Sequence, residues 1–135
     1  MAYTIQMDTI KKRRYTNYTY DGCPVEASLE LMGGKGKGVI LYHLQGKTLR
    51  FNEIKRKLVF ITPRMLTKQL RELESDGLIT RHVYPEVPPK VEYSMTPAGE
   101  SLSAVINALQ EWGEKYGIPL LDKREQGLNT EEDSE

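Results

Sequence analysis

Polar side chains able to donate hydrogen bonds recur in residues 61–77 at the spacing of one helix face. At about 100° per residue, this face lies opposite Leu66, Leu70 and Leu73. Arginine and lysine bind guanine edges and phosphates, and a threonine hydroxyl can bond to any base. The segment therefore predicts a short helix that enters a DNA groove, although an ordinary amphipathic surface helix would carry the same pattern. The polar residues are Arg64, Thr67, Lys68 and Arg71.

The ends of this helix are marked by capping residues. Thr62 is a suitable N-cap, and Pro63 fits the first helical position because an N–H has no partner there. Ile61 and Leu66 have the spacing of a hydrophobic staple, and Gly77 suits the position just after the helix. Because the N-terminal end of such a helix usually meets base edges, Thr62 is also a candidate DNA contact.

The single cysteine is the second candidate for chemistry. Cys23 precedes Pro24 at a predicted helix start, so its sulfur would point toward the free N–H groups of the first turn. Those groups and the helix dipole favour the thiolate, whereas the charges of Asp21 and Glu26 oppose it, so we expect moderate activation. Alternatively, Cys23 is a small apolar residue that closes the helix start.

A small thiol enzyme is the alternative function that this cysteine suggests. Catalysis would need a base within reach of Cys23, such as His43, and a concave site with oriented donors. The sequence supplies no second catalytic signal, and His43 and His82 are isolated rather than grouped at the spacing of metal ligands. We therefore expect neither an enzyme nor a cofactor.

The cellular compartment is indicated by what the sequence lacks. A chain with one cysteine cannot form an internal disulfide. A cytoplasmic location is the default for a protein without disulfides. No apolar run approaches the length of a membrane span, and the opening MAYTIQMDTIKKRR lacks the apolar segment of a secretory leader. We expect a cytoplasmic protein without a membrane partner.

The formal net charge of zero hides an uneven distribution. Residues 35–90 carry twelve basic and five acidic side chains, a net charge of +7. Residues 1–20 carry +3, and residues 122–135 carry −4. A basic middle region suits a polyanionic partner such as DNA, although lysine and arginine can also simply solvate a helical surface.

The residues before the Thr62 helix predict a basic arm and three helices. Residues 1–20, which include KKRRYTNYTY, indicate a flexible arm that lies along DNA or wraps a partner subunit, or is a mobile tail. Helices are expected over residues 24–32, 35–44 and 51–58, with an extended piece at 48–50. The last of them and the Thr62 helix flank a tight turn, which is a helix-turn-helix pattern.

The helix over 35–44 supplies further candidates. Lys35 and Lys37 stand at its start, where we expect both to contact DNA. Its inward side chains are expected to be Val39, Ile40, Tyr42 and His43.

After Gly77 the pattern changes to that of strands. Residues 78–84 and 90–95 alternate and are rich in β-forming residues, with PEVPP between them. We predict a two-stranded hairpin from which Arg81 and Lys90 can contact phosphate. A helix-turn-helix followed directly by a basic hairpin is a winged helix.

A final helix is predicted from Thr96–Pro97 to about residue 116. Its apolar residues are spaced by three and four, the rhythm of a helix that pairs with another helix. The stripe could cover the domain's own core, but we favour a dimer interface because the earlier helices already fill that core. Residues 122–135 are expected to form a disordered acidic tail, which leaves one domain over residues 21–121. The stripe consists of Leu102, Val105, Leu109, Trp112 and Tyr116.

Three stretches together resemble the HxlR-type winged-helix transcriptional regulators, a group related to the MarR-like regulators. They are CPVEASLELMGGKGKGVILYHL, LRFNEIKRKLVFITPRMLTKQLRELESDGLITRHVY and PPKVEYSMTPAGESL. The resemblance implies a homodimer built by the first and last helices, with the Thr62 helix in the major groove and the hairpin on the flanking backbone. It also implies regulation of a nearby promoter. One departure is that the family usually has GGKW where this chain has GGKG at residues 33–36.

The same resemblance bears on Cys23. Several members of the group respond to reactive electrophiles or oxidants through a cysteine just before the first helix, where Cys23 stands. We therefore expect a mostly α fold with a small β-hairpin, a winged helix-turn-helix with additional N- and C-terminal dimerisation helices. The expected function is that of a dimeric, sequence-specific repressor or activator that binds double-stranded operator DNA, with or without a thiol switch at Cys23.

Overall fold

The structure is a computed structural model that describes residues 23–34 and 36–133, with side chains through residue 128, and it divides into two units, Met1–Leu102 and Ser103–Glu135. The first unit contains α2 (Pro24–Met32), α3 (Lys37–Leu44), β1 (Leu49–Arg50), α4 (Phe51–Lys57), α5 (Pro63–Ser75), β2 (Ile79–Tyr84), β3 (Lys90–Met95) and α6 (Pro97–Glu100). The second contains α7 (Ser103–Trp112), a π-helical turn (Gly113–Gly117) and α8 (Ile118–Asp133). The fold is mostly helical with a small sheet, as predicted.

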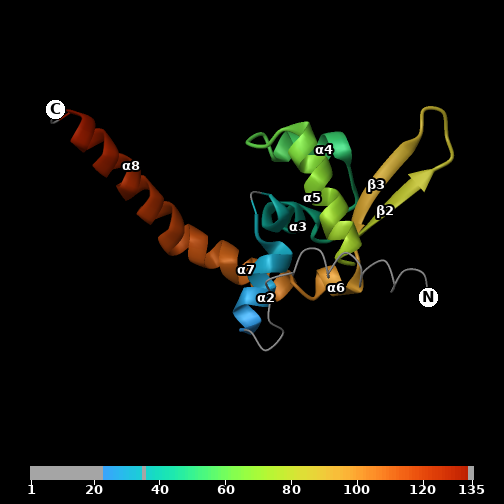
Figure 1. The fold of residues 1–135 in the computed structure, drawn as a ribbon, viewed down its shortest axis with the longest axis horizontal. Helices are drawn as coiled ribbons and strands as arrows, with labels where there is room; N and C mark the ends of the chain where they lie inside the picture. Colours follow the sequence, from blue (N-terminus) through green and yellow to red (C-terminus); the bar gives the residue numbers. More distant parts are fainter. Residues whose placement is uncertain (1–22, 35, 134–135) are drawn as a thin grey trace. The chain divides into compact units, whose positions relative to one another are not determined.

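The sheet is antiparallel, with the strand order β1-β3-β2. Strands β2 and β3 pair along their whole length, from Ile79 opposite Met95 to Tyr84 opposite Lys90, and this hairpin projects from the helices as a wing (Figure 1). The predicted hairpin is thus confirmed. The pairing of β1 with β3 was not predicted, because a strand of two residues carries no alternation pattern.

Leucine and isoleucine side chains from α3, α4, α5 and β2 form the core of the first unit. The three leucines of α5 are buried, as predicted for the inner face of that helix, and Ile61 is buried as a hydrophobic staple requires. Because this face is fixed in the core, the opposite face of α5 is held toward solvent. The fully buried side chains are Ile40, Leu41, Leu44, Ile54, Leu58, Leu66, Leu70, Leu73 and Ile79.

Helix α3 differs from its prediction. It begins at Lys37, and Lys35 lies outside the described residues. Tyr42, which we expected to point inward, is exposed, and Leu41 is buried instead. The reason is helical geometry, since Ile40 and Leu41 lie about 100° apart on the helix whereas Tyr42 lies about 200° from Ile40.

The predicted C-terminal helix is interrupted at residues 101–102, so the expected single domain over residues 21–121 becomes two units. The interruption follows from the way in which α6 is anchored. The Thr96 hydroxyl donates to the Gly77 carbonyl at 2.6 Å and accepts from the Gly99 N–H at 3.1 Å. Gly99 in turn lies so close to the Leu78 carbonyl that a Cβ there would overlap with its oxygen. These contacts fix α6 against the turn between α5 and β2.

The acidic C-terminal segment was predicted to be disordered, which is wrong for residues 122–133, because α8 continues through Asp133. Residues 120–126, LLDKREQ, are mostly strong helix formers, and this propensity outweighs the net charge on which the prediction relied. The expected basic arm over residues 1–20 lies outside the part of the chain that the structure describes.

Candidate nucleic-acid interface

The start of α5 is fixed by the cap that the sequence predicts. The Thr62 hydroxyl accepts a hydrogen bond from the Met65 N–H at 3.1 Å, and Pro63 occupies the first turn. Gly77 has a φ of 78°, the left-handed conformation that glycine adopts readily after a helix. Capping at one end and buried leucines along the inner face hold the outer face of α5 in a defined position.

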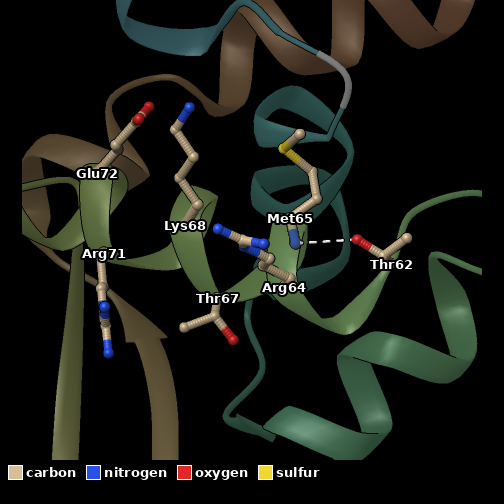
Figure 2. A pocket seen from close by; sticks show the side chains of 7 residues that line it. All are labelled: Thr62, Arg64, Met65, Thr67, Lys68, Arg71 and Glu72. Atoms are coloured by element: carbon tan, nitrogen blue, oxygen red, sulfur yellow. Dashed lines mark hydrogen bonds between the residues drawn. The ribbon is translucent and has the colours of Figure 1, made fainter.

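The outer face of α5 lines a shallow pocket with a volume of about 690 Å³, and this concave surface is shown in Figure 2. In Figure 2, Lys68 and Glu72 point to one side of the helix, and Thr67 and Arg71 point to the other. The Thr67 hydroxyl donates to the Pro63 carbonyl at 2.9 Å, so toward a base it can only accept a hydrogen bond or offer its methyl group. All the candidates predicted on this helix line the surface, together with two residues that the sequence analysis missed. The lining residues are Thr62, Arg64, Met65, Thr67, Lys68, Arg71 and Glu72.

Met65 and Glu72, the two missed residues, flank the basic face at Lys68. Their spacing of three and four residues from Lys68 is visible in the sequence, but neither side chain is basic, and basic donors were the signal from which this face was predicted.

Lys37 was predicted to contact DNA, and the structure contradicts this. Its side chain is only 6% exposed, and its ammonium group forms an ion pair with the carboxylate of Glu72. A buried lysine whose charge is already paired is not available to a phosphate. Its structural effect is to neutralise a carboxylate that lies on the outer face of α5.

The wing carries the two other predicted phosphate contacts. Arg81 is exposed on β2. Lys90 forms an ion pair with Glu92 at 2.9 Å, and its Nζ lies 4.9 Å from the centroid of the Tyr84 ring. The hydrogen bond and charge of Glu92 raise the pKa of Lys90, and the hydrogen bond from Lys90 lowers the pKa of Glu92. To bind a phosphate, Lys90 would have to exchange Glu92 for it.

Arg71 and Arg81, which are ten positions apart in the sequence, line one smaller cavity of about 250 Å³ between α5 and the wing. The fold thus brings together a residue of the helix face and a residue of the hairpin. The sequence pattern assigned them to separate groups.

Cys23 occupies the N-cap position of α2, as predicted, and it is exposed. Its side chain makes no capping hydrogen bond to the helix. The thiol is therefore open to solvent and to reagents rather than engaged at the helix end.

The predicted C-terminal stripe is exposed over most of its length. Leu102 lies before the start of α7 and is half-buried in the first unit. On α7 and the π-helical turn, the other four side chains are exposed, and the rings of Trp112 and Tyr116 lie 6.1 Å apart. An exposed apolar row of this kind is typical of interaction surfaces. The four are Val105, Leu109, Trp112 and Tyr116.

The described residues contain neither a candidate membrane span nor a candidate cluster of metal ligands. No helix within residues 23–34 and 36–133 is both long and apolar enough to cross a membrane. In the same part of the chain, no three histidine, cysteine or acidic side chains are grouped as metal ligands would be.

Comparison with known proteins gives close relatives. The family model described as HxlR-like helix-turn-helix matches residues 31–120. The uncharacterised HTH-type transcriptional regulator YdeP of Bacillus subtilis (strain 168) is 55% identical over 102 residues, which cover 76% of this chain and 80% of YdeP. YybR, an uncharacterised HTH-type transcriptional regulator of the same organism, is 49% identical over 118 residues, or 87% of this chain and 93% of YybR.

Two of the solved structures that match this chain are regulators in their reduced forms. The redox regulator HypR in its reduced form is 49% identical and matches with a TM-score of 0.70 over 74% of this chain and 99% of HypR. The reduced form of the transcriptional regulator YodB from B. subtilis is 35% identical, with a TM-score of 0.62 over 73% of this chain and 97% of YodB.

Proposed function

This chain belongs to the HxlR-like helix-turn-helix family and is a transcriptional regulator of that type, and we propose that it acts as a homodimer whose α5 helices enter the major groove of operator DNA. The observation that carries the proposal is the outer face of α5. Arg64, Thr67 and Lys68 lie near the capped N-terminus of this helix and line one concave surface with Thr62. Side chains near this end of a recognition helix contact base edges.

The roles of the basic residues follow from their positions. Arg64 offers a planar fork of donors that matches a guanine edge, and Lys68 can bind guanine or phosphate. Arg81 and Lys90 are proposed phosphate contacts of the wing, the latter after release from Glu92. Lys35 is also proposed as a DNA contact, because of its charge alone. Lys37 is not proposed as a DNA contact, because it is buried and ion-paired.

The homodimer is proposed from the exposed stripe on α7. A twofold interface places the same residues of both protomers against one another, and it fixes two recognition helices at the spacing of two operator half-sites. Val25 and Leu29 on α2 are also exposed apolar residues, as expected if the first helix contributes to the interface.

Cys23 is proposed as a thiol switch. HypR has been solved in reduced and oxidised forms, and YodB has been solved after treatment with diamide. With a single cysteine per chain, diamide can join the Cys23 thiols of two protomers: each sulfur loses its hydrogen, the N=N bond takes up both, and an S–S bond forms. Such a bridge requires the two Cα atoms to approach within about 7 Å, and alkylation by an electrophile needs no such approach.

The switch is tested with Cys23→Ser as the matched control. Diamide or a quinone should change the DNA affinity of the unaltered protein and leave that of Cys23→Ser unchanged. Equal responses in the two proteins would remove Cys23 from the mechanism.

The DNA-binding proposal is tested by a gel-shift titration at two salt concentrations. The probe is the duplex upstream of the gene for this chain, with a scrambled duplex of equal composition as the control. We expect tighter binding to the upstream duplex at both salt concentrations and weaker binding to both duplexes as salt rises. Equal affinity for the two duplexes would contradict sequence-specific binding there.

No observation favours the thiol enzyme. The close relatives are transcriptional regulators, and we propose that this chain has no catalytic role and acts in the cytoplasm, the compartment of chromosomal DNA in a bacterium such as B. subtilis.

A further inference from the structure

The cavity between α5 and the wing is built from two elements that a DNA strand would pass in succession. The pairing register sets Arg81 of β2 directly opposite Tyr93 of β3, so these two side chains lie on the same face of the sheet. Arg71 reaches the same cavity from α5, and in Figure 2 it points away from Lys68 and Glu72. The residues that line the cavity are Thr67, Leu70, Arg71, Glu74, Arg81 and Tyr93.

The charge of this cavity suits one singly charged anion. Two guanidinium groups and the carboxylate of Glu74 give it a net charge of +1. Within the described residues, neither arginine forms an ion pair, and Glu74 is the one acidic residue that lines the cavity. The described residues therefore leave the cavity with a net positive charge.

The charged donors in the cavity are the guanidinium groups of Arg71 and Arg81, and the Tyr93 hydroxyl is a neutral donor among the lining residues. The Thr67 hydroxyl already donates to the Pro63 carbonyl, so it cannot donate to an anion. A guanidinium group presents parallel N–H donors that match the oxygens of a phosphate, and two such groups can share one phosphate.

We propose that Arg71 and Arg81 together hold a single backbone phosphate of the operator DNA, at the point where the strand passes from the recognition helix to the wing. The inference deepens the proposed function and depends on it. It assigns Arg71 to the backbone rather than to a base edge, and it couples the position of the wing to that of α5. Glu74 moderates the affinity of the site, because it offsets one of the two positive charges.

The counterion slope distinguishes a shared phosphate from two separate phosphates. Each neutralised phosphate contributes about 0.9 to the slope of log affinity against log salt. In a dimer with one shared site per protomer, the double variant Arg71→Ala/Arg81→Ala should lower the slope by about 1.8. Two independent phosphates per protomer would lower it by about 3.6.

The experiment uses the full-length chain and a duplex that the unaltered protein selects from a randomised library. Affinity is measured across a salt series for the unaltered protein, both single variants and the double variant. Arg124→Ala on α8 serves as the control, because it removes one exposed arginine from outside this cavity. The phosphates of the duplex are then replaced one at a time by neutral methylphosphonates.

The expected result is one methylphosphonate position per half-site that weakens binding by the unaltered protein and has no further effect on the double variant. Arg124→Ala should retain the slope of the unaltered protein. Arg71 and Arg81 effects that map to different phosphates, or a change of base preference in Arg71→Ala, would overturn the shared site. If no duplex is selected at all, the proposed function fails as well, so the two failures are distinguishable.

Discussion

Replacing Leu109 with glutamate tests the proposed dimer at the middle of the α7 stripe. Leu109 is 56% exposed in the single chain, so a partner that covered it would bury about half of a leucine side chain per protomer. Full burial of a leucine contributes about 1.5–3 kcal/mol, and a twofold axis counts each loss twice. Loss of both side chains therefore costs roughly 2–3 kcal/mol and weakens the dimer about 30- to 150-fold, before any penalty for two buried charges.

The matched control is Asn107→Glu, which places the same charge on the same helix. Asn107 is exposed and lies about 200° around the helix from Leu109, away from the stripe. Sedimentation over a micromolar concentration series should show dimers for the unaltered protein and for Asn107→Glu, and monomers for Leu109→Glu. DNA affinity should fall with the dimer. A monomeric unaltered protein, or a Leu109→Glu variant that dimerises equally well, would refute the proposed interface.

Three further predictions concern recognition, packing and pH. Arg64→Ala should cost about 1–3 kcal/mol of operator affinity and relax the preference at one base; an unchanged set of selected sequences would contradict this role. Gly99→Ala should lower the free energy of unfolding by about 1–3 kcal/mol, seen as a lower urea midpoint, because its Cβ would overlap with the Leu78 carbonyl; an unchanged midpoint would contradict this. Burial, followed by two nearby lysines, lowers the pKa of His43 below its usual 6.5. The unfolded chain therefore binds that proton first, and stability should fall as pH drops below 6.5; His43→Gln should show a smaller drop in Tm on acidification, and an equal drop would exclude His43 as a source.

The parts of the fold that local chemistry determines were predictable. Thr62, Pro63 and Gly77 mark the ends of α5 through their own backbone preferences, and the spacing of Leu66 and Leu70 identifies its inner face. The alternation in β2 and β3 similarly identified the wing. These signals lie within a few residues of the structure that they specify.

The parts that depend on distant packing were not predictable. Lys37 looked like an exposed base at a helix start, and only the approach of Glu72 from α5 shows it to be buried and paired. In the same way, Arg71 and Arg81 share a cavity only because α5 packs against β2. No spacing in the sequence predicts that Lys37 meets Glu72 or that Arg71 and Arg81 line one cavity.

Packing around Gly36 accounts for the absence of a side chain at this position. A Cβ on the buried Gly36 would lie 2.8 Å from Oε1 of Gln69 and 3.2 Å from Cδ1 of Ile61. The space beside this position, where the family usually has tryptophan, is therefore filled by side chains of the segment that carries α5. Residues 37–44 still form a helix without the tryptophan.

The central claim, that two α5 helices of a dimer contact the major groove, is tested most directly by methylation interference on the selected duplex. Methylation of guanine N7 blocks a major-groove acceptor without altering the backbone. We expect interference at guanines in two clusters about one helical turn apart, with the interference at one guanine of each cluster lost in Arg64→Ala. Binding that is indifferent to N7 methylation at every guanine, or interference confined to a single cluster, would contradict the account.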